Sequence, residues 1–473
     1  MDLQWTVFVQ KRGATELVKI GSVGRPVNGA AAADFGLSIP EGRALLASLQ
    51  QVVGQHQVAA YDELRRRCRR CGRYRRIKDW RYRTIATGLG QVKVRVPRVV
   101  SCLCTPEPLD EDDQPISLRF TECPVDRVLP RGRTPEVAYL CAKHGASTPY
   151  RSAARAVADL AGLRHLCHTT VRRETIACGE HIENAQFHVG WYAGGRKSKG
   201  ARHLRVAIDG TFLTASTCEE CSKFEVIAGR VECDGQMGRR FVSAMQRPTL
   251  TRVLVAAALE QCGWVPGTLV DVVTDGARGM RSMVTSVAPN VAPKILDWFH
   301  LGMKLHTVKS PLFARPLDWR EPPAIIQQCG RMWRKVRDAL WRGRGEKAIE
   351  LVRTLIVSLK EEVPFLPAFY AGCAMTAAGA AAALLKFLVN NRRDLIDYQR
   401  ARMAGRRISS ASAESVMNHL VNSRMSKRQQ MRWSIKGAHC LLQTRVELLD
   451  GRLQNCFASR FPHFRSPELR RAP

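Results

Sequence analysis

Two stretches, Leu204–Leu213 (LRVAIDGTFL) and Leu269–Gly276 (LVDVVTDG), decide the fold that the sequence predicts. Each contains an apolar run followed by an Asp-Gly pair, at Asp209 and at Asp275. Short apolar runs rich in β-branched residues are typical of buried strands. A charge at the end of a buried strand needs an explanation. The ordinary one is a turn or a helix N-cap, because aspartate before glycine is common in both.

The segments around these two stretches extend the pattern into a sheet. Three more strands are predicted, at 223–232, 240–246 and 294–299. Two helices are predicted at 248–261 and 277–287. The order β-β-β-α-β-α-β describes an antiparallel hairpin sheet continued by parallel strands, which is the ordering of a ribonuclease H-like α/β sheet. The strands that end at Asp209 and Asp275 are neighbours in such a sheet. We therefore expect the two carboxylates to lie close together.

A third carboxylate stands far along the chain. Glu414 lies in Ser409–Asn418 (SSASAESVMN), in the first turn of a helix predicted over 411–425. Its ordinary interpretation is compensation of the helix dipole. With Asp209 and Asp275, however, it completes a set of oxygen ligands that suits two Mg²⁺ ions, with Mn²⁺ as a possible substitute. Two such ions about 3.5–4 Å apart stabilise the attacking and leaving oxygens of a phosphoryl displacement.

The contexts of these three acids resemble those of DDE transposases with a ribonuclease H-like core. Over about residues 60–450 the chain is most similar to bacterial insertion-sequence transposases of the Kra type, which are related to Mutator-like transposases. Asp297–His300 (DWFH) matches a D-x-x-H motif of that superfamily, and the helical block 301–405 lies where those families carry an all-helical insertion. The resemblance also covers the C-terminal residues Glu414-Ser415, Arg424-Met425, Met431–Ser434 (MRWS) and Gly437-Ala438.

The resemblance implies metal-dependent strand cleavage at the element ends, followed by attack of a 3′-hydroxyl on target DNA. His300 would lie near the scissile phosphate as a hydrogen-bond donor or general acid/base; the alternative is a structural ring. Trp433 would stack on an extruded base, although packing in the core is its other interpretation. Arg424 and Arg432 would contact phosphate, or would be ordinary solvated arginines.

The charge of the chain points to a polyanionic partner. The 473 residues include 74 Lys and Arg against 42 Asp and Glu, a net charge of +32. Such a field attracts nucleic acid first. A hydrophobic content of 45% excludes a mostly disordered chain. The 16 cysteines are too sparse for a small disulfide scaffold.

The most basic segment carries a candidate zinc site. Residues 61–100 hold 14 Lys and Arg against 3 Asp and Glu, and their C-terminal half predicts a hairpin that turns at Gly88–Gly90. Two cysteine pairs flank this hairpin, and because a hairpin returns the chain to its start, the pairs can meet around a structural zinc ion. These cysteines are Cys68, Cys71, Cys102 and Cys104. The group Cys218, Cys221 and Cys233 is interpreted as ordinary reduced thiols.

Two further regions are candidates for DNA contact. Three short helices over 130–190 suit a helix-turn-helix bundle whose third helix, with Arg172 and Arg173, reads DNA; a plain three-helix connector is the alternative. The segment Arg331–Arg344 (RMWRKVRDALWRGR) interleaves tryptophan with basic residues. We expect it to line DNA through Arg331, Arg334, Lys335, Arg337, Arg342 and Arg344.

These patterns divide the chain into six parts. They are an N-terminal, partly helical segment with a helix over 40–62 (1–60), a zinc-ribbon-like basic module (61–125), the helix-turn-helix bundle (130–190), a catalytic core (203–300 and 406–450) interrupted by an all-helical insertion (301–405), and a C-terminal tail (451–473). The N-terminal residues lack the pattern of a signal peptide, and the uncharged stretch 365–385 is interpreted as a packed helix rather than a membrane span.

The expected partners are therefore DNA, as terminal inverted repeats and target, and further copies of the chain in a homodimer or larger oligomer, with no membrane. The expected location is the bacterial cytoplasm, in association with the nucleoid. Two other functions stay open: a divalent-metal nuclease of the same fold that cuts without joining, and a non-catalytic DNA-binding protein derived from a transposase.

Overall fold

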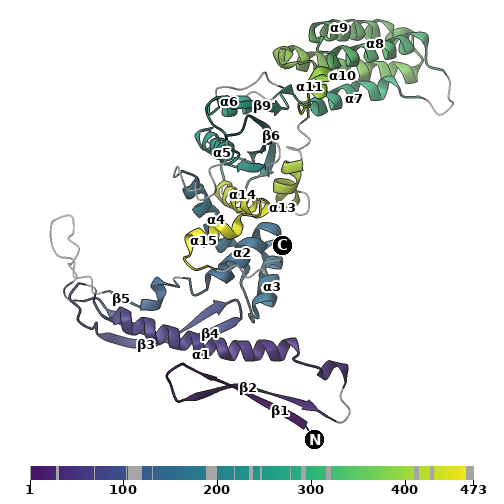
Figure 1. Ribbon diagram of the computed structural model, residues 1–473. Coiled ribbons are helices and arrows are strands. Elements are labelled where there is room, and N and C mark those ends of the chain that lie inside the picture. Colours follow the sequence, from purple (N-terminus) through teal and green to yellow (C-terminus); the bar gives the residue numbers. More distant parts are fainter. Residues whose placement is uncertain are drawn as a thin grey trace. The chain divides into compact units, whose positions relative to one another are not determined.

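The computed structural model describes residues 2–27, 31–68, 70–102, 104, 120–129, 131–187, 200–217, 219–233, 238–245, 248–276, 279–288, 295–315, 321–409, 415–426 and 431–464. The chain divides into two compact units, Met1–Cys178 with Gly451–Pro473 and Gly179–Asp450. It is a mixed α/β protein with a five-stranded mixed sheet and many helices (Figure 1). A cluster of four cysteines lies beside the N-terminal strands.

The first unit consists of two small antiparallel sheets and five helices among its described residues. Its strands are β1 (Asp2–Gln10), β2 (Leu17–Pro26), β3 (Ile77–Thr87), β4 (Gly90–Val100) and β5 (Thr121–Glu122). Its helices are α1 (Ile39–Arg66), α2 (Pro135–Ser147), α3 (Tyr150–Ala161), α15 (Leu453–Arg460) and the first half of α4 (His168–Phe187), with short 3₁₀ turns at η1 (Ala32–Asp34) and η2 (Pro124–Arg127).

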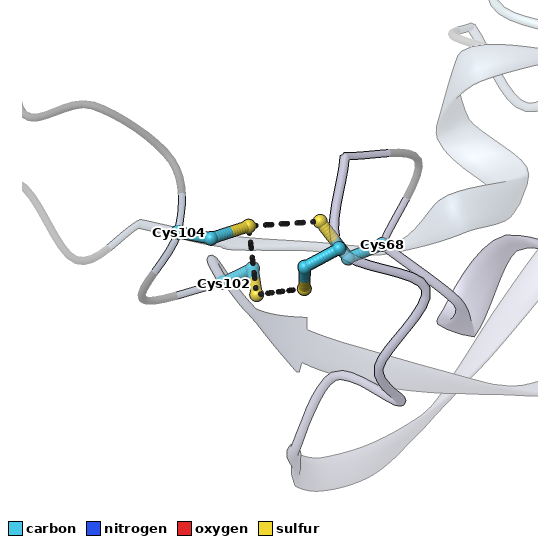
Figure 2. A group of neighbouring side chains, drawn as sticks. Cys68, Cys102 and Cys104 are labelled. Atoms are coloured by element: carbon cyan, nitrogen blue, oxygen red, sulfur yellow. Dashed lines mark hydrogen bonds between the residues drawn. The ribbon is translucent and has the colours of Figure 1, made fainter.

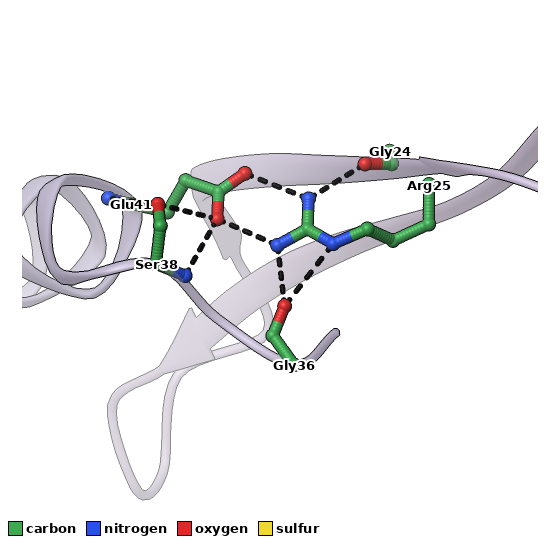
Figure 3. Close-up of polar contacts among 5 residues, drawn as sticks. All are labelled: Gly24, Arg25, Gly36, Ser38 and Glu41. Carbon is green, nitrogen blue, oxygen red and sulfur yellow. Dashed lines mark hydrogen bonds and ion pairs between the residues drawn. The ribbon is translucent and has the colours of Figure 1, made fainter. Parts of the chain in front are cut away.

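The start of α1 is fixed by a capping box that also binds the β1–β2 hairpin. Ser38 is the N-cap: its Oγ accepts from the backbone N–H of Glu41, and a Glu41 carboxylate oxygen accepts from the backbone N–H of Ser38. Arg25 of β2 donates to both oxygens of Glu41 at 2.8 and 2.6 Å (Figure 3). The helix was expected over 40–62 and is longer; the β1–β2 hairpin was not predicted.

Helix α1 covers β4 along both its face and its free edge. Val92, Val94 and Val96 of β4 are buried in one cluster with Val58 of α1. Strand β5 pairs only with Val99 and Val100, so most of the outer edge of β4 has no neighbouring strand. Side-chain amides of α1 take its place along part of that edge. Gln51 bonds both the N–H and the C=O of Lys93, and Gln55 accepts from the N–H of Arg95.

The second unit holds the five-stranded sheet. Its strands are β6 (His203–Thr214), β7 (Lys223–Cys233), β8 (Arg239–Ser243), β9 (Leu269–Thr274) and β10 (Ile295–Leu296). Its helices are α5 (Pro248–Gln261), α6 (Met280–Thr285), α7 (Trp298–Leu312), α8 (Ala324–Trp341), α9 (Gly345–Glu362), α10 (Ala368–Asn390), α11 (Tyr398–Met403), α13 (Ser423–Met425) and α14 (Ile435–Leu449), with 3₁₀ turns η4 (Val363–Phe365) and η5 (Arg392–Asp394) and a π-helical turn η6 (Met417–Asn422).

The strand order in this sheet is β10-β9-β6-β7-β8. Strands β6, β7 and β8 form an antiparallel meander, and β9 and β10 continue it in parallel with β6. The predicted order β-β-β-α-β-α-β is therefore confirmed. Some bounds differ: the strand predicted over 240–246 ends at Ser243, and the helix predicted over 277–287 spans Met280–Thr285. The strand predicted over 294–299 ends at Leu296, because Asp297 caps the N-terminus of α7 and the next residues are helical.

The two faces of the sheet belong to different apolar clusters. Val206, Ile208 and Val272 pack with α5 on one face. Val273 and Ile295 pack with the helices of the insertion on the other. The chain returns to the sheet after α11, where the guanidinium of Arg406 binds the fully buried carboxylate of Asp271 at 2.6 Å. The block 301–405 was expected to be helical, and its described residues form the helices α7 to α11 with short connections between them.

Helix α10 is long and apolar enough to cross a membrane by length and composition, and 33% of its most apolar window is buried. Its residues Ala374, Ala381, Leu384 and Leu388 belong to the apolar cluster of the insertion. One helix of this kind is weak evidence for a membrane span, because the core helix of a soluble protein passes the same test.

The region predicted as a C-terminal tail is partly helical. Helix α15 packs on α2 within the first unit, and the ring of Phe457 meets that of Tyr139 edge to face at 5.3 Å. Phe461 and Phe464 extend the same aromatic group. Residues 453–460 of the predicted C-terminal tail are therefore helical, and Phe457, Phe461 and Phe464 pack against one another.

The contact between Arg25 and Glu41 predicts a pH dependence of stability. Hydrogen bonds from Arg25 and then from Ser38 lower the pKa of Glu41 from 4.5 to about 2. A lowered folded-state pKa stabilises the folded state above the unfolded pKa and loses that effect as the pH falls through the folded value. The melting temperature of Glu41→Gln should lie below that of the parent above pH 4.5, and the gap should close towards pH 2. Exposed Glu16→Gln is the control; a gap that stays constant with pH would refute the linkage.

The ion pair between Arg406 and buried Asp271 predicts a larger loss of stability than the contact between Arg25 and Glu41. Arg406→Met leaves a carboxylate of 1% exposure without its guanidinium partner, beside His203 at 3.0 Å. We expect a loss of about 3 kcal/mol in the unfolding free energy of the second unit, measured by chemical denaturation. Arg407→Met is the matched control, since Arg407 pairs with Glu232 from a half-exposed position and should cost less than about 1 kcal/mol. Equal losses of unfolding free energy in the two variants would contradict the stabilising role of the Arg406–Asp271 ion pair.

Candidate functional site

Three aspartates lie where the parallel pairing of three adjacent strands ends. Asp275 and Asp297 directly follow β9 and β10, whereas Asp209, which was expected at the end of its strand, lies within β6, which continues to Thr214 and pairs with β7 there. Strand β6 pairs with β9 so that Ala207 lies opposite Val273. Asp209 and Asp275 each follow two residues later and therefore lie at the same level of the sheet. Strand β10 pairs Leu296 with Thr274, which brings Asp297 to that level as well. The N–H of Asp297 donates to the Thr274 carbonyl at 2.9 Å, so this edge of the sheet is continuous.

Asp297 orients His300. Its carboxylate is fully buried; one oxygen caps α7 by accepting from the N–H of Phe299 at 2.9 Å, and the other lies 2.6 Å from Nδ1 of His300. This hydrogen bond raises the pKa of His300, burial opposes it, and the negative charges of Asp297, Asp209 and Asp275 add to the rise. The imidazole therefore faces the field of all three carboxylates, with its Nε2 left for other contacts.

The turn after β9 has a steric reason for its glycine. Gly276 has a φ of 92°, and a Cβ there would lie 2.8 Å from Oδ1 of Asn391 at the end of α10. Both the backbone conformation and the close approach of Asn391 therefore favour glycine at position 276. The aspartate beside it, Asp275, is half-buried. In the other pair, Oδ1 of Asp209 accepts from the N–H of Gly210 at 2.8 Å. Asn391 was not singled out in the sequence, where it is one polar residue near a helix end.

Glu414 lies outside the described residues. From Ser415 onward the chain is helical and passes through η6 and α13. Buried Arg445 of α14 holds this turn: its Nε donates to the Leu420 carbonyl at 2.7 Å, and Nη2 donates to the His419 carbonyl and to Ser423 Oγ at 2.5 and 2.8 Å. Burial, and then the charge of Arg424, lowers the pKa of Arg445 to about 10. Sequence reasoning missed Arg445.

The carboxylate oxygens of Asp209, Asp275 and Asp297 do not form a compact group of metal ligands. Within the described part of the chain, the cysteine cluster is the group of three or more His, Cys, Asp or Glu side chains whose ligand atoms all lie within 4.8 Å. Asp209, Asp275 and Asp297 share one edge without meeting that limit. Their chemistry is nevertheless that of hard oxygen ligands, which suits Mg²⁺ with several retained waters.

The chain matches no family model, and no curated protein matches it.

Two residues expected to contact DNA are buried. Trp433 is 6% exposed, its Nε1–H donates to the Met425 carbonyl at 3.4 Å, and its backbone pairs with the end of β6 through Thr214 and Ser216. Arg424 is also 6% exposed, with its guanidinium 5.4 Å from the Trp433 ring centroid. This burial favours the core-packing interpretation of Trp433. The DNA roles of both residues stay predictions. Arg432 is exposed.

The other basic candidates lie on solvent-facing surfaces. On α8 the tryptophans and the basic residues separate: Trp333 is buried and donates to the Leu305 carbonyl at 3.2 Å. The six basic positions on and just after this helix are exposed, namely Arg331, Arg334, Lys335, Arg337, Arg342 and Arg344. Arg172 and Arg173 of α4 are exposed between buried Val171 and Glu174. Exposure leaves these residues available for phosphate, and their DNA roles stay predictions.

The four predicted cysteines lie together (Figure 2). Sγ of Cys68 is 3.3 Å from that of Cys104, Cys71 is 3.5 Å from Cys102, and Cys102 is 3.4 Å from Cys104. They meet because Cys68 and Cys71 precede β3 while Cys102 and Cys104 follow β4, and the antiparallel pairing joins those two ends. Four thiols at this spacing can hold one tetrahedral zinc ion.

The first cysteine pair forms a tight loop. The N–H of Cys68 donates to the Arg73 carbonyl, and the N–H of Gly72 donates to the Cys68 carbonyl. Gly72 has a φ of 71°, which favours glycine at that position. Hydrogen bonds from the backbone N–H groups of Cys71 and Arg70 lower the pKa of Cys68 to about 6, whereas the contacts with Cys68 and the other thiols raise the pKa of Cys104 to about 12. A lowered pKa favours the thiolate, which is the form that binds metal.

The cysteine cluster predicts one zinc ion per chain. Metal analysis of the purified protein should find close to one equivalent, and Cys71→Ser or Cys102→Ser should reduce it to nearly zero, because three thiolates hold the ion far more weakly than four. Cys221→Ser is the matched control and should retain the metal. Zinc that persists in both cluster variants would refute the assignment. Removing the metal with a chelator should also make the β3–β4 hairpin sensitive to protease.

Proposed function

We propose that this chain is a DDE transposase, a polynucleotidyl transferase of bacterial insertion-sequence type that cleaves the ends of its element and joins a 3′-hydroxyl end to target DNA. The observation that carries the proposal is the pairing of β6 with β9, which gives Asp209 and Asp275 the same level at one edge of the sheet. His300 adds an imidazole that experiences the charge of both. Phosphoryl transfer needs acids and a proton-transferring group in such an arrangement.

The topology supports the same proposal. An antiparallel meander of three strands followed by two parallel strands, in the order β10-β9-β6-β7-β8, is the arrangement expected of a ribonuclease H-like core. Helices α7 to α11 separate β10 from η6 and α14, as an all-helical insertion into that core would. The catalytic core would then comprise residues 203–300 and 406–450, and the insertion residues 301–405.

In this proposal Asp209, Asp275 and Glu414 would hold two Mg²⁺ ions, which when bound stabilise the attacking and leaving oxygens of the transfer. The half-buried carboxylates of Asp209 and Asp275 supply donors of the right chemistry. Asp297 holds the His300 ring through Nδ1, which leaves Nε2 to donate to a phosphate oxygen or to move a proton. Arg445 would act as a positioning residue, since it fixes the helical turn that follows Glu414.

The rest of the chain would bind DNA. The helix-turn-helix bundle with Arg172 and Arg173 would read the terminal repeats, and the zinc-holding module would support it. The exposed basic residues of α8 and Arg432 would contact phosphate. A net charge of +32 supports a DNA partner, and affinity should fall steeply with salt as counterions are released. Two element ends must be brought together, so we propose a homodimer or larger assembly in the bacterial cytoplasm.

The test is cleavage and strand transfer on DNA that carries the ends of the element, in Mg²⁺ and in EDTA. Asp275→Asn and Asp209→Asn should each lower the cleavage rate by about 1,000-fold or more, because a carboxylate that balances ionic charge is replaced by a neutral amide. Glu350→Gln is the matched control, an exposed acid on α9. It should leave the rate unchanged.

The products separate the candidate functions. Joined DNA whose formation requires both aspartates supports the transposase. Cutting without joining would identify a nuclease of the same fold. Salt-sensitive DNA binding that is equal in wild type and both variants, with no cutting in Mg²⁺ or Mn²⁺, would favour a DNA-binding protein derived from a transposase.

A further inference from the structure

The β3–β4 hairpin has one covered and one open face. Its covered face carries Val92, Val94 and Val96 under α1. Side chains alternate along a strand, so the residues between them point the other way. The open face carries Lys93 and Arg95 on β4 and Trp80 and Tyr82 on β3. Tyr82 lies opposite Arg95, and Lys93 and Trp80 are the diagonal neighbours of that pair.

The open face joins aromatic rings to cations. The ammonium of Lys93 lies 4.8 Å from the centroid of the Tyr82 ring, and the guanidinium of Arg95 lies 4.8 Å from that of Trp80. These contacts hold two long, mobile side chains in one orientation, which lowers the entropy lost when they bind a partner. Trp80 remains 48% exposed and Tyr82 66% exposed. Large aromatic surface is thus left open beside ordered positive charge.

The face contains no acidic side chain among its paired positions, 80, 82, 84 and 86 of β3 and 91, 93, 95 and 97 of β4. The nearest strand acid, Asp79, belongs to the covered face, where its carboxylate binds Arg98. Charge complementarity therefore selects an anionic partner. Exposed rings select a partner that also has flat, stackable groups.

A DNA strand with unpaired bases has both features. Its phosphates suit Lys93 and Arg95, and its bases can stack on Tyr82, on Trp80 or on the Arg95 guanidinium plane. In an intact duplex the bases stack on one another and offer a sheet surface only phosphates, which leaves the exposed rings unexplained. An acidic protein would bind Lys93 and Arg95 but would offer no flat groups to stack on both Trp80 and Tyr82.

We propose that this open face, formed by Trp80, Tyr82, Lys93 and Arg95, binds single-stranded DNA through base stacking and phosphate contact. The choice of DNA among polyanions rests on the proposed function. The contact itself is separate from the phosphoryl-transfer chemistry. It can therefore exist whether or not Asp209 and Asp275 are catalytic.

The experiment measures binding of the full chain to a fluorescein-labelled 20-nucleotide thymidine oligomer and to a duplex of the same length, by anisotropy. All variants carry Asp275→Asn so that no DNA is cut. Tyr82→Ala and Trp80→Ala should each weaken single-strand binding by roughly fivefold or more. Duplex binding should change by less than about twofold. Tyr82→Phe should keep the parent affinity, because stacking needs the ring and not the hydroxyl.

Lys93→Gln and Arg95→Gln should weaken single-strand binding and reduce its salt dependence by about one phosphate contact each. Phe365→Ala and Lys360→Gln are the matched controls, an exposed ring and an exposed lysine in the helical insertion. Thermal melts and zinc content check that each variant is folded.

Single-strand affinity unchanged in both alanine variants would overturn the proposal. So would equal losses on single strand and duplex, because that result indicates an electrostatic duplex contact. Failure of the catalytic proposal appears separately, as the absence of cleavage by the chain with Asp275 intact.

Discussion

The parallel pairing of β6, β9 and β10 is the constraint on which the candidate site depends. Asp209 and Asp275 stand two residues beyond the pair Ala207 and Val273, so the backbone register sets their relative height. A slip of one residue would turn each side chain to the opposite face of the sheet. The same pairing sets Asp297, whose N–H is bound by the Thr274 carbonyl. The acids therefore share an edge because the strands are locked, before any metal or substrate contributes.

The helical insertion helps to hold that register. The hydroxyl of buried Tyr398 donates to the carbonyl of Leu296, the last residue of β10. Asn391 lies against Gly276 directly after β9. Arg406 binds Asp271 inside β9 as the chain returns to the core. Each contact reaches β9, β10 or the turn beside them, so the loss of insertion packing would loosen the strand ends that carry Asp275 and Asp297.

Sequence patterns predicted the second unit well because its elements are periodic and half-buried. The strand 269–274 was predicted with its exact bounds, since six mostly β-branched residues end at an Asp-Gly pair. The β1–β2 hairpin was not predicted, although Leu3, Trp5, Val7 and Val9 alternate with other residues along β1. Most residues of the hairpin are exposed, so this alternation does not correspond to a buried face. Asp297 was misplaced in a strand because the apolar run continues into α7 and hides the N-cap.

The site residues that sequence reasoning missed act through the tertiary structure. Arg445 and Asn391 each bind backbone or approach a turn that lies far away in the sequence, and no local spacing marks such a residue. Trp433 shows the converse: its motif left both base stacking and core packing open, and its burial in the structure favours core packing. The cysteines were predictable because a hairpin brings its two ends together whatever its length.

The hairpin that joins those cysteines also fixes its own open face. Gln51 of α1 binds both backbone groups of Lys93, and Gln55 binds that of Arg95. These are the residues whose side chains lie over Tyr82 and Trp80. Lys93 and Arg95 therefore take part in both arrangements: their backbone groups bind α1 at the edge of β4, and their side chains are oriented by the rings. Since the backbone is held by α1 and the side chains by the rings, little freedom remains to be lost when a phosphate binds. An open edge would have left the same charges on a strand free to shift.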